Sequence, residues 1–268
     1  MRVLAPPKQP DPRRSLGLKR ILWLAVLMCG GWACAQTPDQ PPAAQELLDA
    51  VVARLPQEPL RMTGDLVVRK RHGIVVRQLG FELFVDWGRT PALARYTLRD
   101  AFGTDLEQLR VTRPAGGASV FDYACGQPLK PAPVPDLFAP LQESDLSWMD
   151  LALSFLWWKG AVLVGSEEVL GRPCYVLEVP APRLSRPVAA APASQPYARV
   201  RLWIDKELPI LLQAEGMNAD SQAIRRLWVR SFKKIDDRWM IKDLEVQQVP
   251  SPHRTKLTIE DVQLDAKP

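Results

Sequence analysis

The chain has 268 residues, with 35 Lys and Arg against 30 Asp and Glu and a formal net charge of +5. Residues 1–35 hold six of the basic side chains and one acidic side chain, which leaves 29 of each sign in the rest of the chain. The basic character therefore belongs to the N-terminal segment. This balance argues against nucleic-acid binding, which depends on a basic surface, and no nucleic-acid partner is expected.

The N-terminal segment has the pattern of a signal peptide. Basic side chains at residues 13–20 precede an apolar run at residues 21–28, and Ala33 and Ala35 are the small residues that a signal peptidase recognises. Cleavage after Ala35 is expected, which would release a periplasmic protein.

A lipid anchor on Cys34 is the alternative to this cleavage. It is disfavoured because Gly31 stands where a lipidation signal usually has an aliphatic residue. Residues 36–42 are polar and proline-rich and are interpreted as a linker. The regular spacing of strands beyond them indicates a single domain over residues 43–268.

The mature chain begins with an amphipathic pattern at residues 43–55, which predicts a helix. From residue 60 the apolar period changes to two, which is typical of strands. Residues 127–140 are interpreted as a proline-studded loop, and residues 181–196 as a flexible loop rich in Ala, Pro and Ser. The strands are expected at residues 61–71, 75–87, 92–100, 107–113, 119–124, 161–169, 174–179, 197–205, 210–217, 224–235, 238–249 and 255–264.

One strongly apolar helix is predicted in the middle of these strands, over residues 148–159. Ser147 and Asp150 form a capping box at its start, and Gly160 suits the left-handed turn after its end. About 12 residues rise only ~18 Å, too short for a membrane span. A helix that is apolar around most of its circumference must be buried. It is therefore either a core helix or a lid over an apolar cavity.

These elements predict a protein that is mainly β with two helices, in the α+β class. Many strands at even spacing indicate a sandwich or a barrel, and a curved sheet can enclose an apolar helix. We expect an incomplete, strongly curved antiparallel β-barrel with the helices packed across its concave face as a lid.

Two cysteines remain after the leader, Cys125 and Cys174. They are a candidate disulfide in an oxidising compartment, which would contribute roughly 4 kcal/mol on the chain-entropy model. Two buried thiols are the alternative, and the sequence leaves both open.

Residues for catalysis are scarce. His72 and His253 lie in expected turns, with no Cys or His at metal-ligand spacing, so neither a catalytic residue nor a metal ion is assigned. No phosphate loop or nucleophile elbow occurs, and no cofactor and no enzymatic activity are expected. Arg225 and Arg226 are interpreted as residues of a strand edge. Arg226 and Arg230 flank Trp228 on one strand and are candidates for contact with a lipid headgroup or an acidic partner.

Three short segments, taken with the order of elements, resemble a known family. They are DLSWMDL at residues 145–151, GRPCYVLE at 171–178 and RLWID at 201–205. The chain resembles the outer-membrane lipoprotein-sorting proteins, the LolA/LolB-like carriers. The resemblance implies a half-open barrel whose helices cover a hydrophobic cavity that holds acyl chains during transit through the periplasm.

A carrier of this kind would bind lipoprotein acyl chains or lipid and would exchange them with an inner-membrane transporter or exporter. It is expected to be a monomer. The alternative is a structural or interaction module of an envelope complex, in which the apolar helix is a permanent plug. The residues expected to line the cavity are Trp148, Leu151, Phe155, Leu156 and Trp158.

Overall fold

The structure is a computed structural model that describes residues 42–182, 197–235 and 238–267. The expected signal peptide, the linker up to residue 41 and residues 183–196 of the expected flexible loop lie outside the described residues. The described helices and strands all belong to one compact unit, which begins at residue 41.

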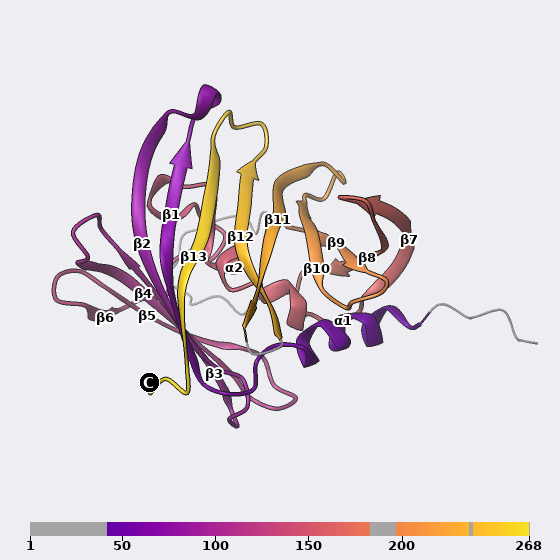
Figure 1. Ribbon diagram of the computed structural model, residues 1–268, viewed down its shortest axis with the longest axis horizontal. Helices are drawn as coiled ribbons and strands as arrows, with labels where there is room; N and C mark the ends of the chain where they lie inside the picture. Colours follow the sequence, from indigo (N-terminus) through magenta and orange to yellow (C-terminus); the bar gives the residue numbers. More distant parts are fainter. Residues whose placement is uncertain (1–41, 183–196, 236–237, 268) are drawn as a thin grey trace, which may run out of the picture. The chain divides into compact units, whose positions relative to one another are not determined.

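This unit is built on one antiparallel sheet of thirteen strands (Figure 1). The strand order is β6-β5-β4-β3-β2-β1-β13-β12-β11-β10-β9-β8-β7, so each half is a meander of sequential neighbours and β1 pairs with β13 in the middle. The strands are β1 Leu60–Arg69, β2 Val75–Asp86, β3 Ala92–Arg99, β4 Asp105–Arg113, β5 Val120–Cys125, β6 Lys130–Ala132, β7 Val162–Val169, β8 Arg172–Pro180, β9 Arg199–Asp205, β10 Leu211–Met217, β11 Ala223–Ile235, β12 Arg238–Gln248 and β13 Arg254–Leu264.

Among the described strands the sheet does not close, because β6 and β7 each have one neighbour there. It curves, and α2 lies behind it in the view of Figure 1. The predicted mainly β class and the open, curved barrel are therefore confirmed. One strand was missed: β6, Lys130–Ala132, pairs with β5 inside the segment that was interpreted as a loop.

The cysteines are not paired. Cys125 ends β5 and is partly buried, whereas Cys174 lies on β8 and is buried; both are free. The disulfide alternative is therefore wrong, and of the two thiols that were expected to be buried only Cys174 is.

The helices include α1, Ala44–Ala53, as predicted, with Leu48 and Val51 on its buried side. Short 3-10 turns occur at η1, Arg71–Gly73, and η2, Leu141–Glu143. The Trp-rich helix starts as expected, since the capping box between Ser147 and Asp150 is present.

The prediction of one continuous helix over residues 148–159 is wrong. α2 covers only Trp148–Leu151, Leu153 takes a left-handed conformation with φ of 44°, and a 3-10 helix, η3, covers Ser154–Trp157. Two adjacent tryptophans after the break have different neighbours: the ring of Trp157 packs on Trp87, while Trp158 packs on Phe155. A straight helix with apolar residues on all sides would need apolar partners on every side. The break lets both faces of this segment find apolar partners.

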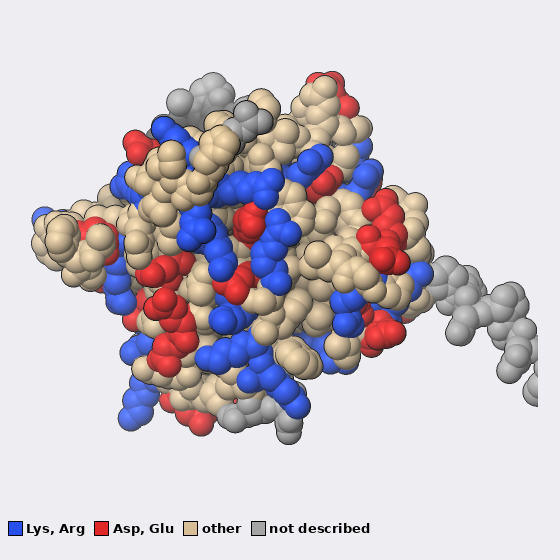
Figure 2. All heavy atoms as spheres, turned by 45° about the horizontal axis from the view of Figure 1, so that its top comes forward, with Lys and Arg blue, Asp and Glu red and all other residues tan. Residues whose placement is uncertain are grey.

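The face of the molecule in Figure 2 carries acidic and basic side chains close to one another. Carboxylates on the strands form ion pairs with basic side chains: Glu82 with Arg95 and Arg99, and Glu245 with Arg230 and Arg254. The charges of opposite sign are thus paired across strands, which suits a solvated face.

Asp243 on β12 offers a test of this pairing. Its carboxylate lies 2.7 Å from the Lys256 ammonium and accepts hydrogen bonds from the hydroxyls of Ser231 and Thr258. Burial opposes ionisation, but these contacts outweigh it and lower the pKa of Asp243 from 3.8 to about 2. Because the folded pKa is the lower one, the stabilisation is complete above about pH 4 and disappears as the pH falls towards 2.

We therefore expect Asp243→Asn to lower the free energy of unfolding by about 2 kcal/mol at neutral pH. The difference from the wild type should vanish near pH 2. Denaturant unfolding across this pH range measures it, with Asp220→Asn, in an exposed turn, as the control. A difference that stays constant with pH would contradict the assignment.

Candidate functional site

An apolar cavity of about 180 Å³ lies between the inner face of the sheet and the helical segments. Of its lining residues only Arg54 is charged, and its walls come from α1, β1, β2, β3, α2, η3, β10, β11, β12 and β13. The lining residues are Val51, Arg54, Leu55, Pro56, Leu60, Met62, Phe81, Leu83, Val85, Trp87, Tyr96, Leu151, Ala152, Leu153, Leu156, Trp157, Pro209, Ile210, Leu211, Phe232, Trp239, Met240, Ile241, Leu244, Leu257 and Ile259.

The alternation of the strands explains how so many apolar side chains meet here. Phe81, Leu83 and Val85 alternate along β2 and line the cavity together, as do Leu257 and Ile259 on β13. Residues two apart on a strand share one face of the sheet. The sequence pattern that predicted the strands therefore also determines the composition of the cavity wall.

The volume of the cavity sets what it can hold. Pockets for drug-sized ligands span roughly 300 to 1,000 Å³, whereas an engineered cavity of about 150 Å³ in another protein binds benzene. At about 180 Å³, the cavity in this structure has room for a small part of a long acyl chain only. A larger ligand requires part of the wall to move.

The residues assigned to the cavity from sequence divide into two groups. Leu151 and Leu156 line it, whereas Trp148, Phe155 and Trp158 are buried in the surrounding core and are not among the lining residues. Trp157, which was not assigned, does line it. The break at Leu153 rotates η3 relative to α2, so spacing along a regular helix did not identify the inward residues.

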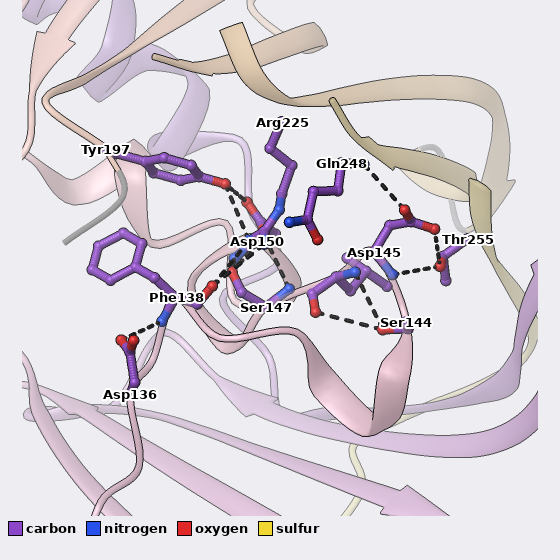
Figure 3. Close-up of polar contacts among 11 residues, drawn as sticks. Asp136, Phe138, Ser144, Asp145, Ser147, Asp150, Tyr197, Arg225, Gln248 and Thr255 are labelled. Atoms are coloured by element: carbon purple, nitrogen blue, oxygen red, sulfur yellow. Dashed lines mark hydrogen bonds and ion pairs between the residues drawn. The ribbon is translucent and has the colours of Figure 1, made fainter. Parts of the chain in front are cut away.

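A buried ion pair fixes α2 against the sheet (Figure 3). Arg225 on β11 donates to the Asp150 carboxylate at 2.6 Å, and the Tyr197 hydroxyl donates to the same carboxylate at 2.7 Å. The backbone N–H and the hydroxyl of Ser147 also donate to Asp150. The Arg225 guanidinium further reaches the backbone carbonyl of Phe138. Both members of the ion pair are buried, with side-chain exposures of 6% and 4%.

The electrostatics of this cluster favour the ionised pair. Burial opposes the charged form of Arg225, but the Asp150 carboxylate and Tyr197 outweigh it and raise the pKa of the guanidinium. Burial, reinforced by the negative charge of Asp150, raises the pKa of the Tyr197 phenol well above its usual value. Tyr197 therefore stays protonated and remains a hydrogen-bond donor at physiological pH.

A second buried carboxylate fixes the chain just before α2. Asp145 accepts a hydrogen bond from the Thr255 hydroxyl at 2.8 Å and from the backbone N–H of Gln248 at 3.1 Å. The Thr255 hydroxyl oxygen also accepts the backbone N–H of Asp145 (Figure 3). The segment before and through α2 is thus attached to β11, β12 and β13 by two polar clusters rather than by apolar packing alone.

The interpretation of Arg225 as a strand-edge residue is wrong, because its side chain is buried and paired with Asp150. The two candidate headgroup residues lie elsewhere on the same strand. Arg226 pairs with Glu215 at 3.0 Å, and Arg230 pairs with Glu245 at 3.0 Å and stacks on Trp228. Both take part in the charge pairs of the outer face and are not brought to the cavity.

Two further findings concern metal binding and membrane-spanning helices. Among the described residues, no three His, Cys, Asp or Glu side chains gather as ligands for a metal ion. Within the same ranges, no helix combines the length and the hydropathy needed to cross a membrane.

Three solved structures are similar to the whole described fold, each at low identity. A DUF1329 family protein from Desulfovibrio piger is 17% identical, with a TM-score of 0.66 and coverage of 83% of this chain and 92% of that chain. A domain described as an outer membrane lipoprotein-sorting protein from Vibrio parahaemolyticus is 14% identical, with a TM-score of 0.64 and coverage of 82% and 92%. A LolA superfamily protein from Nitrosomonas europaea is 14% identical, with a TM-score of 0.63 and coverage of 85% and 96%.

By sequence, no curated protein matches the chain. A family model described as an uncharacterized protein matches residues 132–267, which is just over half of the chain. The fold that the resemblance to the LolA/LolB-like proteins implied is confirmed by these structures. The chain belongs to this family of uncharacterized proteins and has the LolA-like fold of the lipoprotein-sorting proteins.

Proposed function

We propose that the protein is a non-enzymatic carrier that binds acyl chains of lipids or lipoproteins in the apolar cavity. The observation that supports this proposal most directly is the cavity wall, which has apolar side chains from ten elements and a single charged residue, Arg54. Burial of an acyl chain contributes about 0.8 kcal/mol per methylene group. The likeness of the fold to lipoprotein-sorting proteins is in line with this proposal.

In this proposal α2 and η3 act as the lid. Leu151 and Leu156 from this segment line the cavity, and their movement outward would enlarge it. Several methylene groups contribute enough free energy on binding to offset the loss of some lid contacts. The Arg225 to Asp150 pair would then act as a latch that holds the lid closed until cargo arrives.

The proposal places the protein in the periplasm as a soluble chain after removal of residues 1–35. We expect the intact mass of the exported form to correspond to a chain that begins at Gln36. A mass that includes a diacylglycerol group on Cys34 would contradict this and would indicate a membrane-anchored form.

Extraction of bound lipid tests the carrier proposal. Protein purified from the periplasm without detergent should release acyl lipids on organic extraction, identified by mass spectrometry. Absence of lipid, together with no binding of added fatty acid, would overturn the proposal.

A matched pair of variants on β12 locates the binding surface. Ile241 lines the cavity and is partly buried, whereas its neighbour Lys242 is exposed. Ile241→Glu should weaken binding of a fluorescent fatty acid by at least about tenfold. The bound acyl chain would desolvate the new glutamate carboxylate, and this carboxylate would repel the carboxylate of the fatty acid. Lys242→Glu should bind as the wild type does. Equal effects of the two changes would place the binding surface outside the cavity.

The alternative function is an interaction module of an envelope complex. The small volume of the cavity and the two polar clusters that fix α2 favour it, since both suit a permanently plugged barrel. Such a module would release no lipid on extraction. Arg226 and Arg230 on the outer face would be candidates for contact with its partner.

A further inference from the structure

Arg113, at the end of β4, is a buried cation beside the cavity. Its side chain is 7% exposed, and its guanidinium carbon lies 3.8 Å from the ring centre of Trp157 and 5.1 Å from that of Trp87. Both tryptophans line the cavity, as does Tyr96, whose phenol interacts with the same guanidinium. Arg113 therefore lies directly behind the aromatic part of the cavity wall.

No acidic side chain neutralises this cation within the described ranges. None of its three guanidinium nitrogens makes a hydrogen bond of good geometry there, and the neighbouring Tyr96 phenol is an uncharged contact. Glu107 is the other charged residue on the inward face of β4, but it lies six positions away, about 20 Å along the strand. Its carboxylate is occupied by the Tyr123 hydroxyl and the Gln142 amide.

The positive charge of the Arg113 guanidinium therefore lacks an anionic partner in the described part of the chain. Burial lowers the pKa of Arg113, against the opposing influence of Tyr96. Burial also raises the pKa of Tyr96 to about 12, so the phenol is neutral and supplies no negative charge at physiological pH. The two indole rings and the neutral phenol attract the cation, but none of the three supplies a negative charge. Buried charges in folded proteins are normally paired, so an anion is the missing component.

We propose that Arg113 binds the anionic head of the cargo, so that the protein selects amphiphiles with a carboxylate or phosphate head. This inference rests on the proposed carrier function and names its ligand class. A planar guanidinium donates two parallel hydrogen bonds to a carboxylate or phosphate, and a neutral head such as an alcohol cannot accept both. Trp157 belongs to η3, so movement of the lid also uncovers the guanidinium.

Arg54 is the competing site for an anionic head. It lines the cavity from the end of α1, but its side chain is exposed to solvent, where water satisfies its donors. Charge pairs in water contribute little, whereas a desolvated guanidinium gains more from an anion. If Arg113 is the site, its substitution should remove the preference for an acidic ligand; if Arg54 is the site, substitution of Arg54 should remove it.

The test compares dodecanoic acid with dodecan-1-ol, which share a chain and differ in the head. Isothermal titration calorimetry at a pH where the acid is ionised should show that the wild type binds the acid about 10- to 100-fold more tightly. Arg113→Gln should bind both ligands equally, and Arg113→Lys should keep part of the preference. Arg110→Gln, an exposed change on the same strand, and Arg54→Gln should leave the preference intact.

Each result bears on one claim. Equal binding of acid and alcohol by the wild type overturns the role of Arg113 while leaving the carrier function in place, and this comparison needs no variant to fold. Loss of the preference in Arg54→Gln but not in Arg113→Gln overturns the assignment in favour of Arg54. Failure of the wild type to bind either ligand overturns the carrier function and this inference with it.

Discussion

Arg225→Met is expected to lower the free energy of unfolding by roughly 3 to 5 kcal/mol. The change leaves the Asp150 carboxylate buried without its cation, and loss of one member of a buried pair is among the most costly single substitutions. Asp150→Asn should cost a similar amount. The double variant should cost less than the sum by on the order of 2 kcal/mol, because neither remaining group is then an unpaired charge.

Denaturant unfolding of the wild type, both single variants and the double variant measures this coupling. Arg226→Met is the control, because Arg226 is adjacent on β11, is half-exposed and pairs with Glu215 on the outer face. That change should cost no more than about 1 kcal/mol. Additive costs for Arg225 and Asp150 would show that the pair does not hold the lid, and its role as a latch would have to be abandoned.

Phe155→Asp is expected to cost more than about 4 kcal/mol if α2 and η3 stay in place. Phe155 is 1% exposed and packs against Trp158 away from the cavity, so the new carboxylate would have neither water nor a partner. Leu156→Asp, one residue further, places the same group on the cavity wall. Leu156 is 2% exposed, so this change should also lower the stability, but its carboxylate faces the cavity and should abolish fatty-acid binding.

Denaturant melts and binding titrations of these two variants distinguish a lid from a plug. A Phe155→Asp protein that unfolds near the wild-type denaturant concentration would mean that the segment lifts readily and exposes the carboxylate to water. Loss of fold in both variants, combined with no binding of fatty acid by the wild type, would favour the plugged interaction module.

Much of the fold could be predicted from the sequence because it is encoded locally. Alternation of apolar residues located the long strands, and Ser147 with Asp150 marked the start of α2. Gly160 has the positive φ expected after the segment. The break at Leu153 has no local mark, since no Gly, Asn or Pro stands there and leucine rarely adopts a left-handed conformation. The break is accompanied by tertiary contacts of the aromatic rings, which the local sequence does not specify.

The residues of the candidate site were harder to predict from the sequence. Arg225 and Arg113 look like ordinary strand arginines, and nothing adjacent to them in sequence shows that they are buried. Arg225 finds Asp150 only because β11 passes α2 in the folded chain, and Arg113 meets Trp87 and Trp157 from two other elements. Contacts of this kind depend on the curvature of the sheet, which the strand pattern does not specify.

The pairing of β1 with β13 has a consequence for how the molecule folds. Each half of the sheet consists of hairpins between strands that follow one another in sequence. The central pairing of β1 with β13 joins Leu60 to Leu264 and needs nearly all of the domain. Non-local strand pairing of this kind is slow to form. Because Leu257 and Ile259 of β13 line the cavity, its wall is completed only when this pairing forms. A chain that lacks β13 would therefore lack part of the cavity wall and the strand that joins the two halves of the sheet.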